Sequence, residues 1–247
     1  MTTAPLFLVD ALPEGDVGVL DGPEGRHAAT VRRLRAGEGL VLADGRGGLA
    51  HAVVTAVAKD ALELEVVDRR TLPAPAPRVL LAQALVKGDR GELAVELATE
   101  AGVDGVLPWR AARCVARWEA GPRGDKALAR WRATVREAAK QARRAWVPEV
   151  EEPVTTTALA RRAADVPTLV LHESATDGLA AVDLPADGDL LLVVGPEGGI
   201  ADDELDALVA AGARAVRLGP EVLRASTAAA VALGALGVLT GRWTPPP

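Results

Sequence analysis

The stretch Leu190-Leu191-Leu192-Val193-Val194-Gly195-Pro196-Glu197-Gly198-Gly199-Ile200 decides the fold. Its apolar half predicts a fully buried strand that ends where Gly-Pro interrupts it, and residues 201–205 have the acidic first turn of a helix. A second apolar run, 213–218, also ends on Gly-Pro and precedes a long apolar helix. The residues after these strands are called the first Gly-Pro loop (195–200) and the second Gly-Pro loop (219–224). Loops at the same ends of two buried strands are where an open α/β sheet binds a ligand.

Strands and helices alternate along the chain from residue 78 onward. Such alternation predicts a mainly parallel sheet that is covered by helices on both faces. The expected strands are 79–85, 103–108, 168–172, 190–194 and 213–218, and the expected helices are 91–101, 126–146 and 224–240.

The first 72 residues have a different pattern, with short strand-like runs separated by turns. Asp44-Gly45-Arg46-Gly47-Gly48 is a strong hairpin signal, and the proline-rich stretch 71–77 is typical of a linker. We therefore expect a small β-barrel or sandwich in 1–72 and an α/β domain in 78–247. The expected strands of the first domain are 17–20, 39–43, 50–54 and 62–67.

Composition excludes several classes of protein. Cys114 is the only cysteine, so neither a disulfide within the chain nor a zinc site built from a cysteine cluster can form. No apolar run approaches the roughly 18–20 residues that a membrane span needs, and the N-terminus lacks a basic n-region. These features predict a soluble cytoplasmic protein without a metal.

The net charge of −6 conceals clusters of basic residues. In the helix expected at 126–146, basic residues recur at helical spacing with Glu137 as the exception among them. A solvated charged face is the ordinary explanation of such a pattern, and the scarcity of acids keeps a phosphate-contacting surface open as the alternative. Aromatic residues are few, so base stacking is not expected to be the main mode of binding. The candidates for RNA contacts are Arg32, Arg33, Arg35, Lys87, Arg132, Arg136, Lys140 and Arg144.

The first Gly-Pro loop matches neither a Walker loop nor the dinucleotide fingerprint. Its exposed backbone groups suit hydrogen bonds to an adenine or a ribose. A tight structural turn is the alternative, because Gly22-Pro23-Glu24-Gly25 repeats the same tetrapeptide in the β-rich region.

Arg224 comes at the start of the last apolar helix, where a cation opposes the helix dipole and needs a compensating partner. We favour a functional role over a surface arginine bonded to a nearby carbonyl. Ser226 and Thr227 have an equally ordinary alternative role as helix caps.

Read in order, these motifs resemble the small-subunit (16S) ribosomal RNA uracil-N3 methyltransferase family of the SPOUT superfamily. The resemblance covers nearly the whole chain. Besides the two Gly-Pro loops, it includes His27-Ala28-Ala29-Thr30-Val31-Arg32-Arg33, Asp44-Gly45-Arg46-Gly47, Lys87-Gly88-Asp89, Ala98-Thr99-Glu100-Ala101-Gly102-Val103 and Ala138-Ala139-Lys140-Gln141.

The resemblance implies an N-terminal PUA-like β-barrel that helps to grip RNA and a C-terminal SPOUT α/β domain with a trefoil knot. It also implies a homodimer that binds S-adenosyl-L-methionine and methylates ribosomal RNA or the small ribosomal subunit. Since uracil N3 must lose its proton, a cation near a uracil carbonyl would stabilise the developing anion, and our hypothesis is that Arg224 is this catalytic residue. The implied cofactor-binding residues are Leu171, His172, Gly195, Glu197, Gly198, Gly199, Ile200, Leu218, Gly219, Leu223, Arg224, Ser226 and Thr227.

The chain departs from the family pattern at several places. Glu221 replaces a usual arginine, Ser226 a usual glutamate and Leu97 a common lysine, and Ala111-Ala112 replaces a Ser-Glu pair. Two alternatives stay open: another SPOUT methyltransferase that acts on a transfer RNA base or a ribose 2′-hydroxyl, and a non-catalytic RNA-binding protein. A nucleotide-binding α/β module is disfavoured, because the phosphate-loop lysine is absent.

Overall fold

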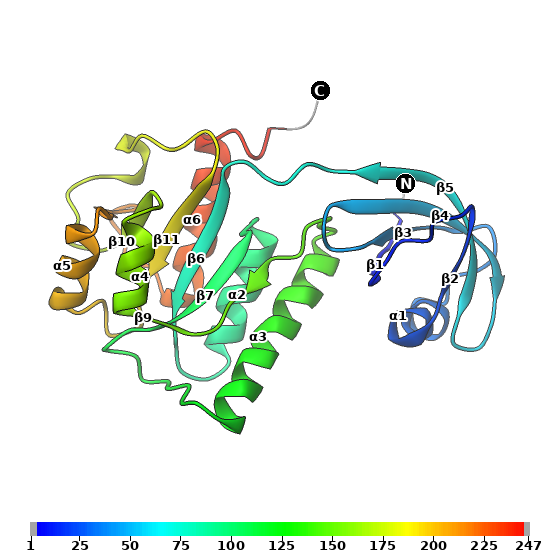
Figure 1. The fold of residues 1–247 in the computed structure, drawn as a ribbon, viewed down its shortest axis with the longest axis horizontal. Coiled ribbons are helices and arrows are strands. Elements are labelled where there is room, and N and C mark those ends of the chain that lie inside the picture. Colours follow the sequence, from blue (N-terminus) through cyan, green and yellow to red (C-terminus); the bar gives the residue numbers. More distant parts are fainter. Residues whose placement is uncertain (1–3, 245–247) are drawn as a thin grey trace. The chain divides into compact units, whose positions relative to one another are not determined.

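The computed structural model describes residues 4–244, which form two compact units (Figure 1). The first unit contains the residues up to Ala74 together with Ala139–Val147, and the second contains Pro75–Ala138 and the residues from Pro148 on. The limits expected from sequence, 72 and 78, leave out the segment 139–147, which helical periodicity alone assigns to the second part of the chain.

The first unit is built on one five-stranded sheet with the order β1-β3-β4-β5-β2. The turn at Asp44 joins β3 to β4 as an antiparallel pair, as the hairpin signal predicts. Alternate residues of β4 and β5 are buried, which is the period of a sheet with one covered face. The strands are β1 (Leu6–Leu8), β2 (Val17–Leu20), β3 (Gly39–Ala43), β4 (Gly48–Val57) and β5 (Leu62–Thr71).

The tetrapeptide Gly22-Pro23-Glu24-Gly25 begins a short helix, α1 (Gly22–Arg26), which continues into a π-helical turn, η1 (His27–Val31). Proline within the first turn of a helix is favourable, because its missing N–H has no partner there. The same tetrapeptide at residues 195–198 forms a loop and turn and not a helix. The repeat in sequence therefore does not indicate a repeated structure.

The second unit is an α/β structure with a seven-stranded sheet in the order β12-β10-β11-β6-β7-β8, and β9 pairs with β7. Every strand pair in this sheet is parallel, so the predicted parallel sheet is confirmed. The trefoil knot stays a prediction, since strand order alone does not trace how the chain threads. The strands are β6 (Arg78–Ala84), β7 (Gly105–Arg110), β8 (Glu149–Val150), β9 (Val154–Thr155), β10 (Thr168–Leu171), β11 (Asp189–Val194) and β12 (Arg214–Val216).

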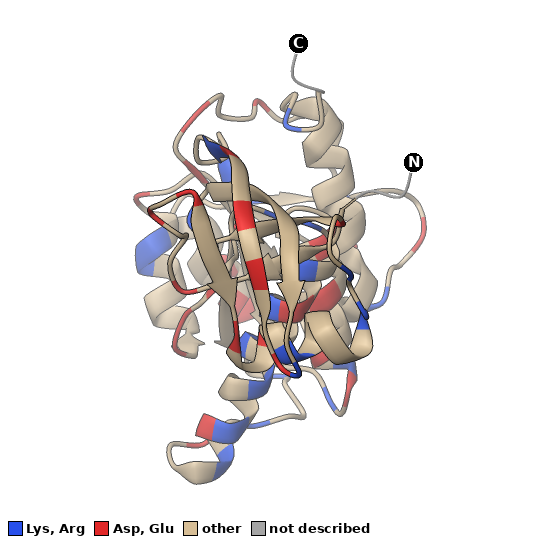
Figure 2. Cartoon of the chain, turned by 90° about the vertical axis from the view of Figure 1, so that its right-hand side faces the viewer, with Lys and Arg blue, Asp and Glu red and all other residues tan. Residues whose placement is uncertain are grey.

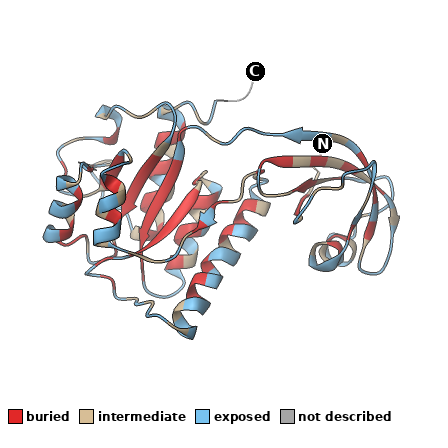
Figure 3. Cartoon of the chain, viewed as in Figure 1, coloured by how far each residue is buried: buried red, intermediate tan, exposed pale blue. Residues whose placement is uncertain are grey.

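Helices cover the buried central strands of this sheet (Figures 1 and 3). Helix α2 packs against α6, and α4 packs against α5. None of the helices within residues 4–244 has the length and apolar character that a bilayer span requires. The helices are α2 (Arg90–Glu100), α3 (Pro122–Gln141), α4 (Thr156–Ala163), the 3₁₀ turn η2 (Leu179–Ala181), α5 (Asp202–Ala210) and α6 (Ala225–Leu239).

The predicted limits of α3, 126–146, are wrong at both ends. The helix begins earlier, at Pro122, which directly follows Gly121. It ends at Gln141, because Arg143 has a φ of 56°, a left-handed conformation that an α-helix cannot contain. Apolar periodicity does not report such a backbone reversal.

The segment that follows α6 is fastened to the sheet by a buried ion pair. Arg242 Nη1 lies 2.6 Å from Asp104 Oδ2, and Arg242 Nη2 donates to the carbonyl of Gly102 at 2.7 Å. The same Asp104 oxygen accepts the backbone N–H of Val79 at 2.9 Å. The side chains of Arg242 and Asp104 are only 10% and 5% exposed.

Replacing Arg242 by alanine is expected to lower the free energy of unfolding by about 3–5 kcal/mol, because the Asp104 carboxylate is left buried without its cation. The measurement is urea unfolding of the full chain. The control is Arg214→Ala, whose ion pair with Asp177 has side chains 47% and 44% exposed. That pair is expected to contribute about 1 kcal/mol or less. Equal losses in the two variants would contradict the role given to Arg242.

Candidate active site

The C-terminal ends of three neighbouring strands are aligned at one edge of the second unit's sheet. Leu171 of β10 is in register with Val194 of β11 on one side and with Val216 of β12 on the other. Because the strands are parallel, the loops that follow them emerge at the same edge. The two Gly-Pro loops, which sequence predicts to share a site, therefore lie together.

A cavity of about 450 Å³ lies between these loops and reaches the start of α6. Its volume is within the range of about 300–1,000 Å³ that is usual for small-molecule sites. Gly198, Gly219 and Thr227 belong to the same segments but do not line it. Most of the predicted cofactor residues do: Leu171, His172, Gly195, Glu197, Gly199, Ile200, Leu218, Leu223, Arg224 and Ser226.

The first Gly-Pro loop is both a tight turn and a wall of the cavity. The N–H of Gly199 donates to the carbonyl of Pro196 at 2.9 Å, and Gly199 has a φ of 73°. A Cβ atom on Gly195 would lie 2.6 Å from Ile200 Cγ1, closer than side chains can pack. Glycine is thus required at both positions for the loop to close in this way.

Three contacts hold the first Gly-Pro loop in place. Glu197 Oε1 accepts the backbone N–H of Lys87, which follows β6, at 3.3 Å. Arg113, which follows β7, donates from Nη1 to the carbonyls of Ile200 at 3.2 Å and Gly198 at 3.4 Å. The loop is therefore fixed from two neighbouring strands.

Glu204 lies on α5, the helix that follows this loop, and its side chain connects α5 to two other segments. Its buried carboxylate accepts the N–H of Ala112 at 3.0 Å and the hydroxyl of Thr156 at 2.5 Å, both through Oε1. Thr156 in turn accepts from Nε1 of the buried Trp109 at 3.1 Å. A network that contains two buried side chains, Glu204 and Trp109, fixes geometry only while every member keeps its partner.

Replacing Glu204 by alanine is expected to lower the free energy of unfolding by about 1–3 kcal/mol, since the N–H of Ala112 and the half-buried hydroxyl of Thr156 lose their acceptor. Glu204→Gln keeps an accepting oxygen and is expected to lose less than half as much. Asp206→Ala, an exposed acid on the same helix, serves as the control and is expected to change stability by about 0.5 kcal/mol at most. Thermal and urea unfolding measure all three, and an unchanged Glu204→Ala variant would argue against the network.

Charged groups of both signs surround the cavity. Sequence reasoning missed Arg90, Glu173, Arg217 and the apolar Val222, although three of these directly adjoin predicted positions. The only sequence signal for Glu173, Arg217 and Val222 is that each one is next to a predicted residue. Adjacency in sequence does not tell whether a side chain faces the cavity. The carboxylates are those of Glu173, Glu197 and Glu221, and the guanidinium groups are those of Arg90, Arg217 and Arg224.

Arg224 is the N-cap residue of α6, and its carbonyl accepts the N–H groups of Thr227 and Ala228, each at 2.9 Å. Within residues 4–244 its exposed guanidinium has no hydrogen bond or ion pair, so the alternative of a surface arginine bonded to a carbonyl does not hold. Ser226 and Thr227 do not cap the helix by a side chain. Instead, the hydroxyl of Thr227 donates to the Arg224 carbonyl at 3.2 Å.

The residues proposed for RNA contacts fall into two groups. Arg132 pairs with Glu152 at 3.0 Å, and Lys140 pairs with Glu24 at 3.0 Å in a largely buried contact. The expectation that this helix face lacks acids is therefore incomplete, because Glu152 and Glu24, which lie outside the helix, supply them. Figure 2 shows acidic and basic residues interspersed along the chain. Arg136 and Arg144 also have partners. Arg32, Arg33, Arg35 and Lys87 are exposed.

Burial raises the pKa of the Cys114 thiol, with the neighbouring charges of Glu204 and Glu197 adding to the effect. The thiol is therefore protonated at neutral pH and is not a nucleophile. Within residues 4–244 no group of three or more His, Cys, Asp or Glu side chains is arranged to hold a metal ion.

The family profile of an RNA methyltransferase domain matches residues 73–237, and that of an RNA methyltransferase PUA domain matches residues 20–67. A protein named ribosomal RNA small subunit methyltransferase E from Mycobacterium tuberculosis is 57% identical, over 97% of this chain and 94% of its own length. The protein of the same name from Bacillus subtilis is 31% identical over 90% of both chains.

Solved structures give the same result. A ribosomal RNA small subunit methyltransferase E from Neisseria gonorrhoeae, bound to S-adenosylmethionine, superposes with a TM-score of 0.85 at 28% identity over 96% of this chain and 98% of its own. A methyltransferase from Legionella pneumophila, also with S-adenosylmethionine, has a TM-score of 0.83 at 28% identity, with the same coverage of both chains. These matches confirm the expected fold: a PUA-like domain followed by an α/β domain of the SPOUT type.

Proposed function

The chain belongs to the RNA methyltransferase family, and from this premise we propose that it transfers a methyl group from S-adenosylmethionine to N3 of a uridine in small-subunit ribosomal RNA. The observation that carries the proposal is that the two Gly-Pro loops together line one cavity at the sheet edge. A cofactor that supplies the methyl group and an acceptor base must meet there.

The residues around the cavity fit S-adenosylmethionine. Its adenosyl group is flat and largely apolar, and Leu171, Ile200 and Leu218 provide apolar walls beside the backbone of the first Gly-Pro loop. The cofactor also carries a sulfonium, an ammonium and a carboxylate, which are complemented by the carboxylates and guanidinium groups of the lining. Ser226, whose side chain is buried in the wall, adds a hydroxyl.

When bound, S-adenosylmethionine supplies an electrophilic methyl carbon on a leaving group that needs no proton. The protein's contribution is then alignment, which can account for about 7–11 kcal/mol of the barrier. Uracil N3 must also lose its proton, and negative charge develops on the adjacent carbonyl oxygens. The unpaired guanidinium of Arg224 is the group that stabilises this charge, as preorganised donors do in other active sites.

The remaining parts of the chain have supporting roles in this proposal. Residues 1–72 form the PUA-like domain that grips RNA, with Arg32, Arg33 and Arg35 among its exposed cations. Residues 78–247 form the methyltransferase domain with a trefoil knot. A ribosomal substrate places the protein in the cytoplasm.

A homodimer is part of the proposal because the outer face of α6 lacks charge. No Asp, Glu, Lys or Arg occurs in Ala225–Leu239, although Val231 and Val238 are exposed. A helix that is apolar on all sides is normally buried. The neighbouring Val222 of the second Gly-Pro loop is also exposed, so this apolar surface adjoins the wall of the cavity. A second copy of the chain would cover both.

The test combines the purified full chain with S-adenosylmethionine and small ribosomal subunits, followed by mass spectrometry of the nucleosides. We expect 3-methyluridine at one position. A ribose-methylated product, or activity on transfer RNA only, would support the alternative SPOUT activities. Calorimetry with S-adenosylmethionine separates the third alternative, since a non-catalytic RNA-binding protein with a degenerate cavity would give no heat.

A further inference from the structure

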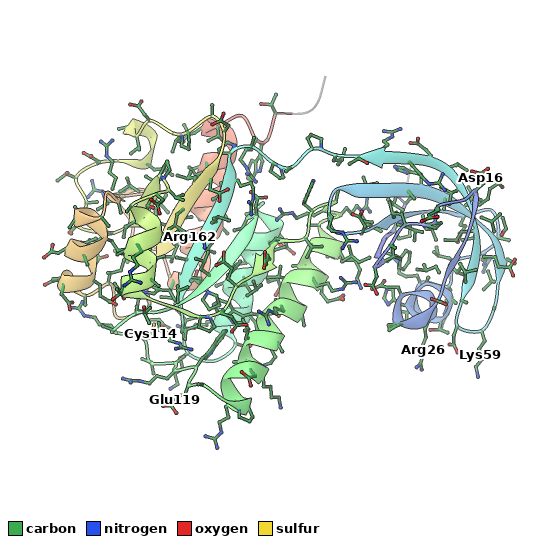
Figure 4. All side chains as sticks on the ribbon, viewed as in Figure 1. Asp16, Arg26, Lys59, Cys114, Glu119 and Arg162 are labelled. Atoms are coloured by element: carbon green, nitrogen blue, oxygen red, sulfur yellow. The ribbon has the colours of Figure 1, made fainter. Side chains whose placement is uncertain are left out.

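A second cavity, of about 320 Å³, lies beside the segment that joins β7 to α3. Figure 4 labels Cys114 and Glu119 on this segment. Neither the cofactor chemistry nor the predicted site residues use it. It is lined by Leu85, Arg110, Cys114, Arg117, Trp118 and Glu119, with three alanines of the same segment.

The second cavity adjoins the proposed methyl-transfer site. Leu85 lines the second cavity, and the next residue, Val86, lines the first. The N–H of Leu85 donates to the carbonyl of Trp109 at 3.0 Å, which holds the end of β6 against β7. Arg113, within the same segment, bonds the carbonyls of the first Gly-Pro loop. The two cavities thus share the stretch of chain at the end of β6.

Two cations at the second cavity lack a partner in the described part of the chain. Arg110 and Arg117 are exposed, and within residues 4–244 neither side chain has a hydrogen bond or an ion pair. Two such guanidinium groups on one cavity suit a phosphate, which they can bind through paired N–H donors. Glu119 at the same cavity is only an acceptor when ionised, so it suits an N–H edge of a base rather than the phosphate.

The cavity also presents an aromatic side chain, that of Trp118. Trp118 is half-buried, and its ring lies edge-on against Trp131, with 4.8 Å between ring centroids and 77° between ring planes. Trp131 is fully buried and packs against Gly91, where a Cβ atom would lie 3.1 Å from Trp131 Nε1. The contact with the buried Trp131 restricts the orientations that the Trp118 ring can adopt. Only 2% of the residues in the chain are aromatic, and one of them, Trp118, lines the same cavity as Arg110 and Arg117.

The floor of the cavity is neutral. Cys114 is buried, and its Sγ lies 3.7 Å from the carbonyl of Trp109. The desolvated thiol keeps its proton, so it adds no negative charge that would repel an anion. Cations at the rim, a ring in the wall and an uncharged floor together match one nucleotide: a phosphate and a flat base.

We propose that this second cavity binds a single nucleotide of the RNA substrate, unstacked from its neighbours, with its phosphate at Arg110 and Arg117 and its base on Trp118. The inference rests on the proposed function and specifies where that function holds its RNA. It assigns stacking to one base only, in keeping with the scarcity of aromatic residues.

The test measures methylation of small-subunit RNA by the full chain, with the affinity for S-adenosylmethionine measured separately by calorimetry. Arg117→Ala and Trp118→Leu are each expected to raise KM for RNA by about tenfold or more, since stacking and phosphate contacts have effects of this size. Cofactor affinity is expected to stay unchanged. Arg161→Ala, at an exposed arginine of α4 that does not line the cavity, removes the same charge and is the control.

Salt dependence gives a second readout that a purely structural role would not move. Removing both Arg110 and Arg117 is expected to reduce the slope of log KM against log salt by about 0.7, the value for one phosphate contact in a single strand, because both side chains bind the same phosphate. Because both side chains are exposed, this variant is expected to fold normally.

Uridine 5′-monophosphate provides a direct probe. It is expected to inhibit methylation competitively with RNA in the wild type and much less in Arg117→Ala. Equal inhibition by inorganic phosphate at the same concentration would overturn the nucleotide assignment. A wild type that neither methylates RNA nor binds S-adenosylmethionine would refute the proposed function, whereas an active wild type with unchanged KM in all the cavity variants would refute this inference alone.

Discussion

Arg224→Ala is expected to lower kcat by about 10²–10³, the usual cost of removing one preorganised donor from an active site, while S-adenosylmethionine still binds. The structural reason is that the guanidinium lies at the cavity without any partner in the described part of the chain. Its backbone carbonyl, and not its side chain, is what α6 uses at its first turn. The substitution is therefore expected to slow methyl transfer without lowering the free energy of unfolding.

Three measurements make this result specific. Steady-state kinetics gives kcat, calorimetry gives the affinity for S-adenosylmethionine, and urea unfolding checks that stability is unchanged. Arg224→Lys keeps the charge but loses the planar fork, so it is expected to fall between alanine and the wild type. Full turnover in Arg224→Ala would remove this residue from the mechanism. An equal loss of cofactor affinity would make it a binding residue instead.

The cavity could be predicted from sequence because its walls follow directly from two short, regular signals. Each Gly-Pro loop ends an apolar strand, and parallel strands place such loops at one edge whatever the remaining topology. Local pattern was sufficient there: Leu171, Gly195 and Leu218 all line the cavity.

Sequence could not predict the contacts that join distant segments. Glu204 and Ala112 are 92 residues apart, and Lys140 and Glu24 are 116 apart. Nothing in the local sequence around Glu204 distinguishes it from its neighbours Asp202 and Asp203, although it alone of the three is buried. The second cavity was missed for a related reason, since residues 110–119 form neither a helix nor a strand beyond Arg110 and so have no periodicity to read.

Val231→Glu is expected to convert the proposed dimer into a monomer and to abolish methyl transfer. A carboxylate introduced at the centre of the uncharged face of α6 would be buried without a partner, at a cost of about 3–5 kcal/mol. In a two-fold symmetric dimer the substitution occurs twice at the same interface, so the effect is doubled. Dissociation constants are expected to rise by more than about 10³, measured by sedimentation equilibrium together with the methylation rate.

Val209→Glu is the matched control, because Val209 of α5 is 47% exposed and Val231 is 48% exposed. Both substitutions add one carboxylate to an exposed valine on a helix of the same unit, so net charge, exposure and helix propensity change alike. Only the surroundings differ: α5 carries acids in its first turn, as a solvated helix does, whereas α6 carries no charge at all. If both variants stay dimeric, or both dissociate, α6 is not the interface. If Val231→Glu is monomeric but fully active, one copy of the cavity is sufficient for catalysis, and the second copy does not complete the site.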